Sequence, residues 1–368
     1  MRGFQLLSLI IILFSTQIAL AWGGRGHHAI CHSSMFLVKE KGLRDFLASR
    51  PHTLGHLCNI PDIHWKNSGP EQNKIGSPTH WIDPEVIGVK LADIPADYKK
   101  LINKYSGKTN LFDGEKKIAS VPGELGSIWW RADQFWRRAV DFGKKIKSAK
   151  APKDPKEQQD EALPYNSATF EFLVNLGLMG HFTGDASMPF HTTADHDGYQ
   201  AGHGGIHWFY EDGNVDKQDE SMETKLIEEA RKMQAMAVSK DKNEKNQVRF
   251  LTEKNRIEQM RQLTILSSAD IQSILDIDKI TVPSEKAKPE NNNTKQPAKR
   301  LAPEVTAAAY QPYIIKHMAR SAVLLAAMWD EAYVKAGRPD LSAYRSYRYP
   351  FTPDFVNPDY YEIKTSNP

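Results

Sequence analysis

The amino-acid sequence predicts an all-α fold, with one multi-helix domain that carries an inserted helical and loop region. Apolar residues recur at helical spacing along most of the 368-residue chain, and strand-like alternation is scarce. The composition, 40% hydrophobic and 25% charged, is that of a globular protein with a sizeable core and excludes a mainly disordered chain. The formal net charge of +3 provides no global field that would by itself favour nucleic acid or an anionic membrane as a partner.

The N-terminus has the features of an export signal. Arg2 supplies a positive charge, an apolar run follows to Phe14, and Ala19-Leu20-Ala21 has the small-x-small form that signal peptidase accepts. An uncleaved membrane anchor is the alternative, but the run is shorter than the roughly 20 residues that span a bilayer. We therefore expect residues 1–21 to be removed between Ala21 and Trp22, which places the mature protein in the periplasm or outside the cell.

The two cysteines, Cys31 and Cys58, fit this compartment, because an even cysteine count in an exported protein usually indicates a disulfide. The bond would tie the start of the mature chain to the stretch that contains Asp62. Zinc ligation by the thiols is the alternative, but neither cysteine belongs to a Cys-x-x-Cys pair. We expect a Cys31–Cys58 disulfide.

The clearest helical patterns lie at 126–147 and 170–184. The first has an apolar stripe opposite basic residues and predicts an amphipathic helix that packs on the core. The second is apolar nearly all round, as expected of a helix buried at the centre of a bundle. Further helices are expected at about 29–41, 221–238, 247–268 and 305–336.

The later part of the chain contains a linker and a tail. Residues 283–303 are rich in Lys, Pro, Asn and Glu, which predicts an exposed linker. The helix predicted after this linker has apolar residues that must pack against other helices. We therefore expect this helix to close a main domain at 22–336, which carries an insertion at about 216–302. The aromatic and proline-rich tail, 337–368, is expected to strap over the core, with a lipid or substrate surface as the alternative.

Histidine is distributed unevenly, because 12 of the 13 histidines lie at or before His207. His181 and Asp185 are four residues apart on the predicted buried helix, so they project from one face and can share a metal ion. Pro189 should end that helix just before His191. His207 and Glu211 repeat the same spacing. Imidazole and carboxylate without thiolate suit zinc in a catalytic site.

Each of these pairs has a simpler interpretation. A single His-x-x-x-Asp on a helix is more often a hydrogen-bonded or surface pair. Two such pairs within 31 residues, joined by His191 and by a glycine-rich turn at 198–205, favour a metal site. The chain contains no His-Glu-x-x-His motif, no Gly-x-Ser-x-Gly motif and no phosphate-binding glycine-rich loop, so a zinc protease or serine hydrolase is not indicated.

Taken together, these motifs resemble the trinuclear-zinc superfamily of bacterial zinc-dependent phospholipases C and secreted single-strand-specific nucleases. The resemblance covers 181–211, the mature opening Trp22-Gly-Gly-Arg-Gly-His27, Asp62 in Ile-Pro-Asp-Ile-His-Trp and His80 in Pro-Thr-His-Trp-Ile-Asp. It implies an all-α catalytic domain with a buried trinuclear zinc site.

The resemblance also implies a ligand set for three Zn²⁺ ions per chain. The amine and carbonyl of Trp22, with His27, would hold one ion, Asp185 would bridge it to a second, and a third would lie apart. The second ion is held by Asp62, His80 and His181, and the third by His191, His207 and Glu211. Asp62 and Asp185 are the expected catalytic carboxylates, with water as the nucleophile.

The ligand motifs indicate the substrate class less directly than they indicate the metal site. The 16-residue interval from His191 to His207, the Gly-Gly-Ile before His207 and Glu211 as the last ligand are similar to the phospholipases, whereas the short opening from Trp22 to His27 is more like the nucleases. We expect a secreted phospholipase C that releases diacylglycerol and a phosphorylated head group from phospholipids such as phosphatidylcholine at a membrane surface.

Two other functions stay open. The first is a secreted single-strand-specific nuclease or nucleotidase, whose partner would be nucleic acid. The second is a zinc-binding export protein without catalysis, for which closed coordination spheres would be expected. No obligate protein partner is evident from the sequence.

Overall fold

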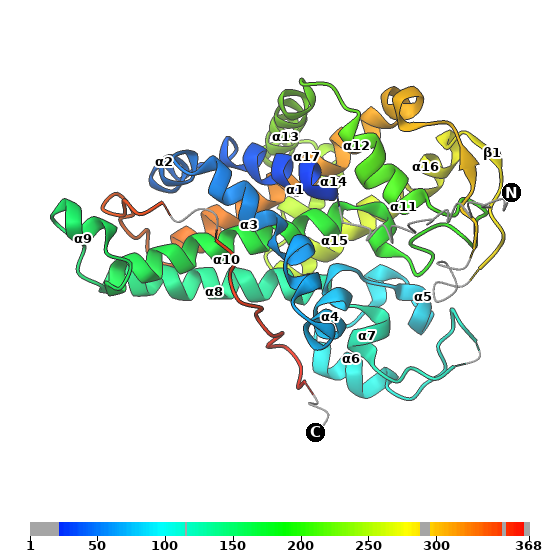
Figure 1. Ribbon diagram of the computed structural model, residues 1–368, viewed down its shortest axis with the longest axis horizontal. Coiled ribbons are helices and arrows are strands. Elements are labelled where there is room, and N and C mark those ends of the chain that lie inside the picture. The colour runs from blue at the N-terminus through cyan, green and yellow to red at the C-terminus, as the bar shows by residue number, and fades with distance from the viewer. Residues whose placement is uncertain (1–21, 115, 288–294, 348–350, 364–368) are drawn as a thin grey trace, which may run out of the picture.

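A computed structural model describes residues 22–114, 116–287, 295–347 and 351–363. Five of its helices form a bundle, which Figure 1 shows from the side. The helices of this bundle are α1 (Gly23–Met35), α3 (Pro51–Ile63), α8 (Ile128–Ser148), α10 (Pro164–Ser187) and α17 (Pro303–Lys335). The protein is therefore mainly helical, which confirms the predicted fold class.

Helix α10 is the centre of the bundle and packs against α8, α3, α17 and α1. Pro164 occupies its first turn, where the missing backbone N–H costs nothing. Every residue from Phe172 to Ser187 is buried, as the all-round apolar pattern predicts. The helix ends before Pro189, because the residue that precedes a proline disfavours the α conformation.

Further elements surround this bundle. The helices are α2 (Lys41–Ala48), α4 (Pro70–Gly76), α5 (Pro84–Ile87), α6 (Tyr98–Tyr105), α7 (Val121–Leu125), α9 (Pro155–Gln159), α11 (Ile206–Trp208), α12 (Asn214–Asp216), α13 (Met222–Val238), α14 (Lys242–Gln247), α15 (Arg256–Ser268) and α16 (Ile271–Ile277). Five single-turn 3₁₀ segments are η1 (Trp65–Asn67), η2 (Ser77–His80), η3 (Leu91–Asp93), η4 (Pro189–Thr192) and η6 (Arg249–Leu251), and η5 (Phe209–Gly213) is a π-helical turn.

Two of the predicted helical segments differ from the structure. The segment 29–41 spans the end of α1 and the start of α2, with a break between them. The segment 247–268 begins too early, because α15 starts at Arg256, where the side chain of Asn255 caps it by accepting from the Glu258 N–H. Helix α3 was not predicted, since Gly55 and Pro61 weaken its pattern.

The region expected as an insertion, 216–302, packs closely on the bundle. Helices α13 and α16 contact α17, and α15 contacts both α8 and α10. A two-stranded antiparallel sheet joins β1 (Ile280–Val282) to β2 (Lys299–Arg300). The end of the expected linker is thus part of a strand, while 288–294 lie outside the described residues.

The C-terminal segment 351–363 crosses α8 and continues toward α4, as expected for a strap over the core (Figure 1). The Trp65 indole donates to the Pro353 carbonyl at 2.9 Å, and the Arg131 guanidinium donates to the Val356 carbonyl at 2.6 Å. Arg131 is completely buried among aromatic rings, among them Phe135 at 4.8 Å and Phe182 at 5.4 Å. Such rings stabilise a buried cation through their electron-rich faces.

The disulfide between Cys31 and Cys58 is present and connects α1 to α3, which confirms the prediction. Helix α10 passes directly over it, because a Cβ atom at Gly180 would collide with both sulfur atoms. The absence of a side chain at Gly180 therefore lets three helices meet at one point.

No helix of the described residues has both the length and the apolar character to cross a bilayer. The predicted signal peptide, residues 1–21, lies outside the described residues, which begin at Trp22.

An ion pair between His32 on α1 and Glu223 on α13 predicts pH-dependent stability. The atoms His32 Nδ1 and Glu223 Oε2 are 2.6 Å apart. The hydrogen bond to Glu223 raises the pKa of His32, and the same bond lowers the pKa of Glu223. The pair therefore stabilises the fold below the usual histidine pKa of about 6.5, and this contribution is lost as the pH rises through the raised pKa of His32.

We expect Glu223→Gln to lower the free energy of unfolding by up to about 1 kcal/mol at pH 5.5 and by less at pH 8.5, as measured by urea denaturation. Glu229→Gln is the matched control, because Glu229 pairs with Lys232 on the same helix at 3.0 Å and no histidine takes part in that pair. A Glu223→Gln effect of equal size at both pH values would contradict the prediction.

Candidate metal centre

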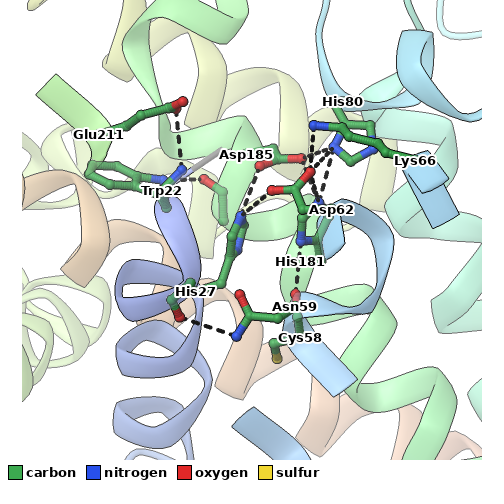
Figure 2. Close-up of polar contacts among 12 residues, drawn as sticks. Trp22, His27, Cys58, Asn59, Asp62, Lys66, His80, His181, Asp185 and Glu211 are labelled. Carbon is green, nitrogen blue, oxygen red and sulfur yellow. Dashed lines mark hydrogen bonds and ion pairs between the residues drawn. The ribbon is translucent and has the colours of Figure 1, made fainter. Parts of the chain in front are cut away.

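All nine residues of the predicted ligand set converge in the interior of the bundle, although seven different elements or helix ends contribute them. Figure 2 shows Asp185 and Asp62 between His27 on one side and His80 and His181 on the other. The contributions are Trp22 and His27 from the start of α1, Asp62 from α3, His80 from η2, His181 and Asp185 from α10, His191 from η4, His207 from α11 and Glu211 from η5.

Asp185 lies between two groups of side chains that could each hold a metal ion. Its Oδ1 atom is 3.3 Å from His27 Nε2, and its Oδ2 atom is 3.2 Å from His181 Nε2 and 2.9 Å from His80 Nδ1. The two carboxylate oxygens thus face different histidines. This arrangement suits the bridging role that the resemblance implies.

His27, His181 and Asp185 form the first group, and Asp62, His80 and His181 form the second. In the second group the Asp62 Oδ1 atom is 3.5 Å from His80 Nδ1 and 3.7 Å from His181 Nε2. His181 is oriented by a contact of 2.8 Å between its Nδ1 atom and the carbonyl oxygen of Cys58. Metal-binding histidines commonly use one ring nitrogen in this way, which leaves the other free to ligate.

The third group consists of His191, His207 and Glu211. The Nε2 atoms of the two histidines are 2.9 Å apart, and the Glu211 Oε2 atom is 3.1 Å from His207 Nε2. Glu211 lies in the π-helical turn η5, so the segment is not the regular α-helix that its spacing predicted. Single π-helical turns occur frequently at functional sites.

Trp22 joins the third group to the first. Its backbone nitrogen donates to Glu211 Oε2 at 3.2 Å, and its indole nitrogen donates to the Gly184 carbonyl at 2.8 Å (Figure 2). The Trp22 side chain is completely buried. The structure thus places the Trp22 nitrogen next to Glu211, whereas the resemblance groups it with His27.

Burial makes most of these histidines suitable as ligands. It lowers the pKa of His27, holds the pKa of His191 well below its usual value, and lowers the pKa values of His80 and His207 to about 4. The imidazoles are then neutral at physiological pH, which metal binding requires. His181 differs, because Asp185 and Asp62 outweigh burial and raise its pKa.

The pKa values of the carboxyl groups of Asp62 and Glu211 are shifted in opposite directions. Burial disfavours their charge, but Lys66 and His181 lower the pKa of Asp62 to about 2. Burial, together with the negative charges of Asp62 and Asp185, raises the pKa of Glu211 well above its ordinary value. A bound cation would offset this excess of negative charge.

Several buried polar atoms of these groups form no hydrogen bond with the described residues. They include His27 Nδ1, His191 Nδ1 and Glu211 Oε1. A buried polar atom without a hydrogen-bond partner costs about 1–3 kcal/mol, so several of them in one place call for a ligand. Three buried groups of imidazole and carboxylate fit metal ions, and the nitrogen and oxygen donor set suits zinc.

Lys66 is a residue of this site that the sequence analysis did not identify. Its Nζ atom is 2.6 Å from Asp62 Oδ1, and its side chain is only 14% exposed. The pair has i, i+4 spacing, but that signal is meaningful only once Asp62 is known to lie at the end of a helix. Because α3 was not predicted, the pairing could not be inferred.

Neither a protein-family model nor a curated protein sequence matches this chain. The proposed relationship therefore rests on the short ligand motifs, on their order along the chain and on the convergence of these residues in space.

The arrangement predicts how many zinc ions each variant retains. We expect the mature protein to hold three zinc ions and His207→Ala to hold two, because His207 belongs to one group alone. Asp185→Asn should lose more than one ion, since Asp185 contacts His27, His80 and His181. Metal analysis after dialysis measures this, with His52→Ala as the control because His52 is exposed on the surface. Equal metal content in all four proteins would contradict the prediction.

Proposed function

We propose that the protein is a zinc-dependent phosphodiester hydrolase whose substrates are phospholipids and which becomes active after export. The observation that carries the proposal is the convergence of three adjoining His and carboxylate groups around Asp185, deep in the bundle. The order and spacing of these residues resemble the trinuclear-zinc phospholipases and nucleases, which supports hydrolysis of a phosphate ester.

In this proposal, zinc and the carboxylates Asp62 and Asp185 have different tasks. Zinc, when bound, acidifies water near neutral pH and withdraws negative charge from phosphate oxygens. Asp62 stays ionised beside Lys66 and can accept a hydrogen bond from the attacking water. Asp185 holds His27 and His181 at fixed positions on either side. Water adds to phosphorus, the ester P–O bond breaks, and the leaving alcohol takes up a proton, so no covalent intermediate with the protein is needed.

Phospholipid is the proposed substrate class for two reasons. The short interval between His191 and His207 and the glutamate at position 211 resemble the phospholipases. The turn before His207 also carries Asp195 and Asp197, and Glu85 accepts from the backbone N–H of Ala194 on that turn at 3.0 Å. The carboxylate of Asp197, which interacts electrostatically with His207, would favour a cationic head group over a polyanionic strand.

A single-strand-specific nuclease is the second candidate. It is favoured by the short opening of the mature chain, in which His27 follows Trp22 within the first turns of α1. A phosphodiester in a nucleic acid presents the same phosphorus centre, so the metal groups alone do not distinguish the two substrates.

A paired assay on the zinc-loaded mature protein tests the proposal. We expect release of phosphocholine from phosphatidylcholine vesicles and no cleavage of single-stranded DNA. Asp62→Asn should lower the rate about 100-fold or more, because it removes a carboxylate positioned for proton transfer. His52→Ala should retain the full rate. Cleavage of DNA alone would overturn the phospholipid assignment, and inactivity on both substrates with three zinc ions bound would support a non-catalytic zinc-binding protein.

A change at the N-terminus tests the role of processing. We expect a protein that keeps Ala21 before Trp22 to bind less zinc and to lose activity, because the Trp22 nitrogen is then an amide that cannot ligate. The matched control is the mature protein that begins at Trp22, prepared in the same way. Unchanged zinc content and activity in the extended protein would show that the Trp22 amine is not a ligand.

A further inference from the structure

We infer that Tyr210, His317 and Asp270 form a buried hydrogen-bonded chain that positions the third metal group and Trp22. Asp270 lies in the region 216–302, between α15 and α16, so this region would contribute directly to the metal centre. The inference rests on the proposed function only in that it takes His191, His207 and Glu211 as zinc ligands.

His317 is the middle of the chain and uses both ring nitrogens. It lies on α17 and is completely buried. Its Nδ1 atom is 2.7 Å from the Tyr210 hydroxyl, and its Nε2 atom is 2.9 Å from Asp270 Oδ2. Because an ionised carboxylate can only accept, Nε2–H donates to Asp270. Burial lowers the pKa of His317 to about 4, so the ring is neutral and Nδ1 accepts from the Tyr210 hydroxyl. The direction of both hydrogen bonds is therefore determined.

Asp270 is itself held in place. Lys316 Nζ is 2.8 Å and Arg320 Nη1 is 3.1 Å from the same Oδ2 atom that faces His317. Both cations come from α17, and Arg320 also donates to the Leu266 carbonyl at the end of α15 at 2.9 Å. The Asp270 carboxylate is thus held in one position, and its hydrogen bond orients the ring of His317.

Tyr210 transmits this constraint to the metal site. It precedes Glu211 in the π-helical turn η5 and is completely buried. Its ring centroid is 5.8 Å from that of Trp22 and 6.0 Å from that of Phe190, the residue before His191. One side chain therefore contacts Trp22 and the neighbour of one ligand, while its own backbone carries the next ligand.

A phenylalanine at position 210 could fill the same apolar space, so packing alone does not explain the hydroxyl. A hydroxyl bonded to a fixed imidazole prevents the ring from shifting and hence the π-helical turn from relaxing. Outer hydrogen bonds of this kind commonly change metal affinity 10-fold to 100-fold. The hydrogen-bonded chain of Tyr210, His317 and Asp270 thus serves to position Glu211 and Trp22.

The test is the zinc affinity of the mature protein, measured by competition with a chelator. We expect Tyr210→Phe to weaken, by about 10-fold, the zinc ion that His207→Ala removes, which is the ion of the third group. Tyr165→Phe is the matched control, because Tyr165 is also buried and also loses a hydrogen bond, but its hydroxyl donates to the Asp340 carbonyl at 2.6 Å and not to His317. It should leave all three affinities unchanged.

Asp270, at the end of the hydrogen-bonded chain, provides a second test. Asp270→Ala should weaken the same zinc ion as Tyr210→Phe, whereas Asp270→Asn, which keeps an oxygen acceptor, should restore most of the affinity. If Tyr210→Phe and Asp270→Ala lower only the thermal stability of the metal-free protein and not the zinc affinity, the chain is merely structural and the inference is wrong. A zinc shift without hydrolytic activity would retain the inference and reject the proposed function.

Discussion

The buried carboxylate of Asp185 imposes a constraint that the rest of the structure satisfies. It lies in a helix with no solvent-exposed face over its second half, where an isolated negative charge is costly. Nearby side chains must therefore compensate its charge. His27 comes from α1, His80 from η2 and His181 from the preceding turn of α10, all within 3.3 Å of a carboxylate oxygen. The elements that pack around α10 are thus the ones that bring the candidate ligand residues together.

This convergence needs an unusually close approach of helices. A Cβ atom at Gly180 would collide with the disulfide, and one at Gly184 would lie 2.9 Å from the His27 ring. Glycine at these positions lets α1 and α3 reach α10, and the ring of His27 then stacks on that of His181 at 4.1 Å. The disulfide adds a covalent link at the same point, and the Cys58 carbonyl orients His181. Packing, cross-linking and ligand orientation use the same few residues.

The sequence predicted site residues well where all the residues of a motif lie on one element. The spacing of His181 and Asp185 needs only α10, and the pairing of two cysteines leaves no choice of partner. It was less informative where a contact depends on an element with a weak signal. Lys66 pairs with Asp62 across the end of α3, whose helical pattern Pro61 interrupts. The π-helical turn that carries Glu211 has no distinctive composition, and nothing in the helical spacing of His317 indicates that both its nitrogens have partners.

The three metal groups differ in what supports them. The two groups that share His181 are built from the central bundle except for His80, which comes from η2, so most of their geometry follows from the core. The third group depends on a segment that follows a glycine-rich turn, and other elements must hold that segment. Arg300 in β2 donates to the His203 and Gly204 carbonyls at 2.8 and 3.0 Å, and Asp278 contacts His203 Nδ1 at 2.8 Å. A loosely held turn would lose the rigidity that ligand geometry needs. The additional helices and strands of 216–302 therefore give the third group the fixed surroundings that the bundle gives the other two.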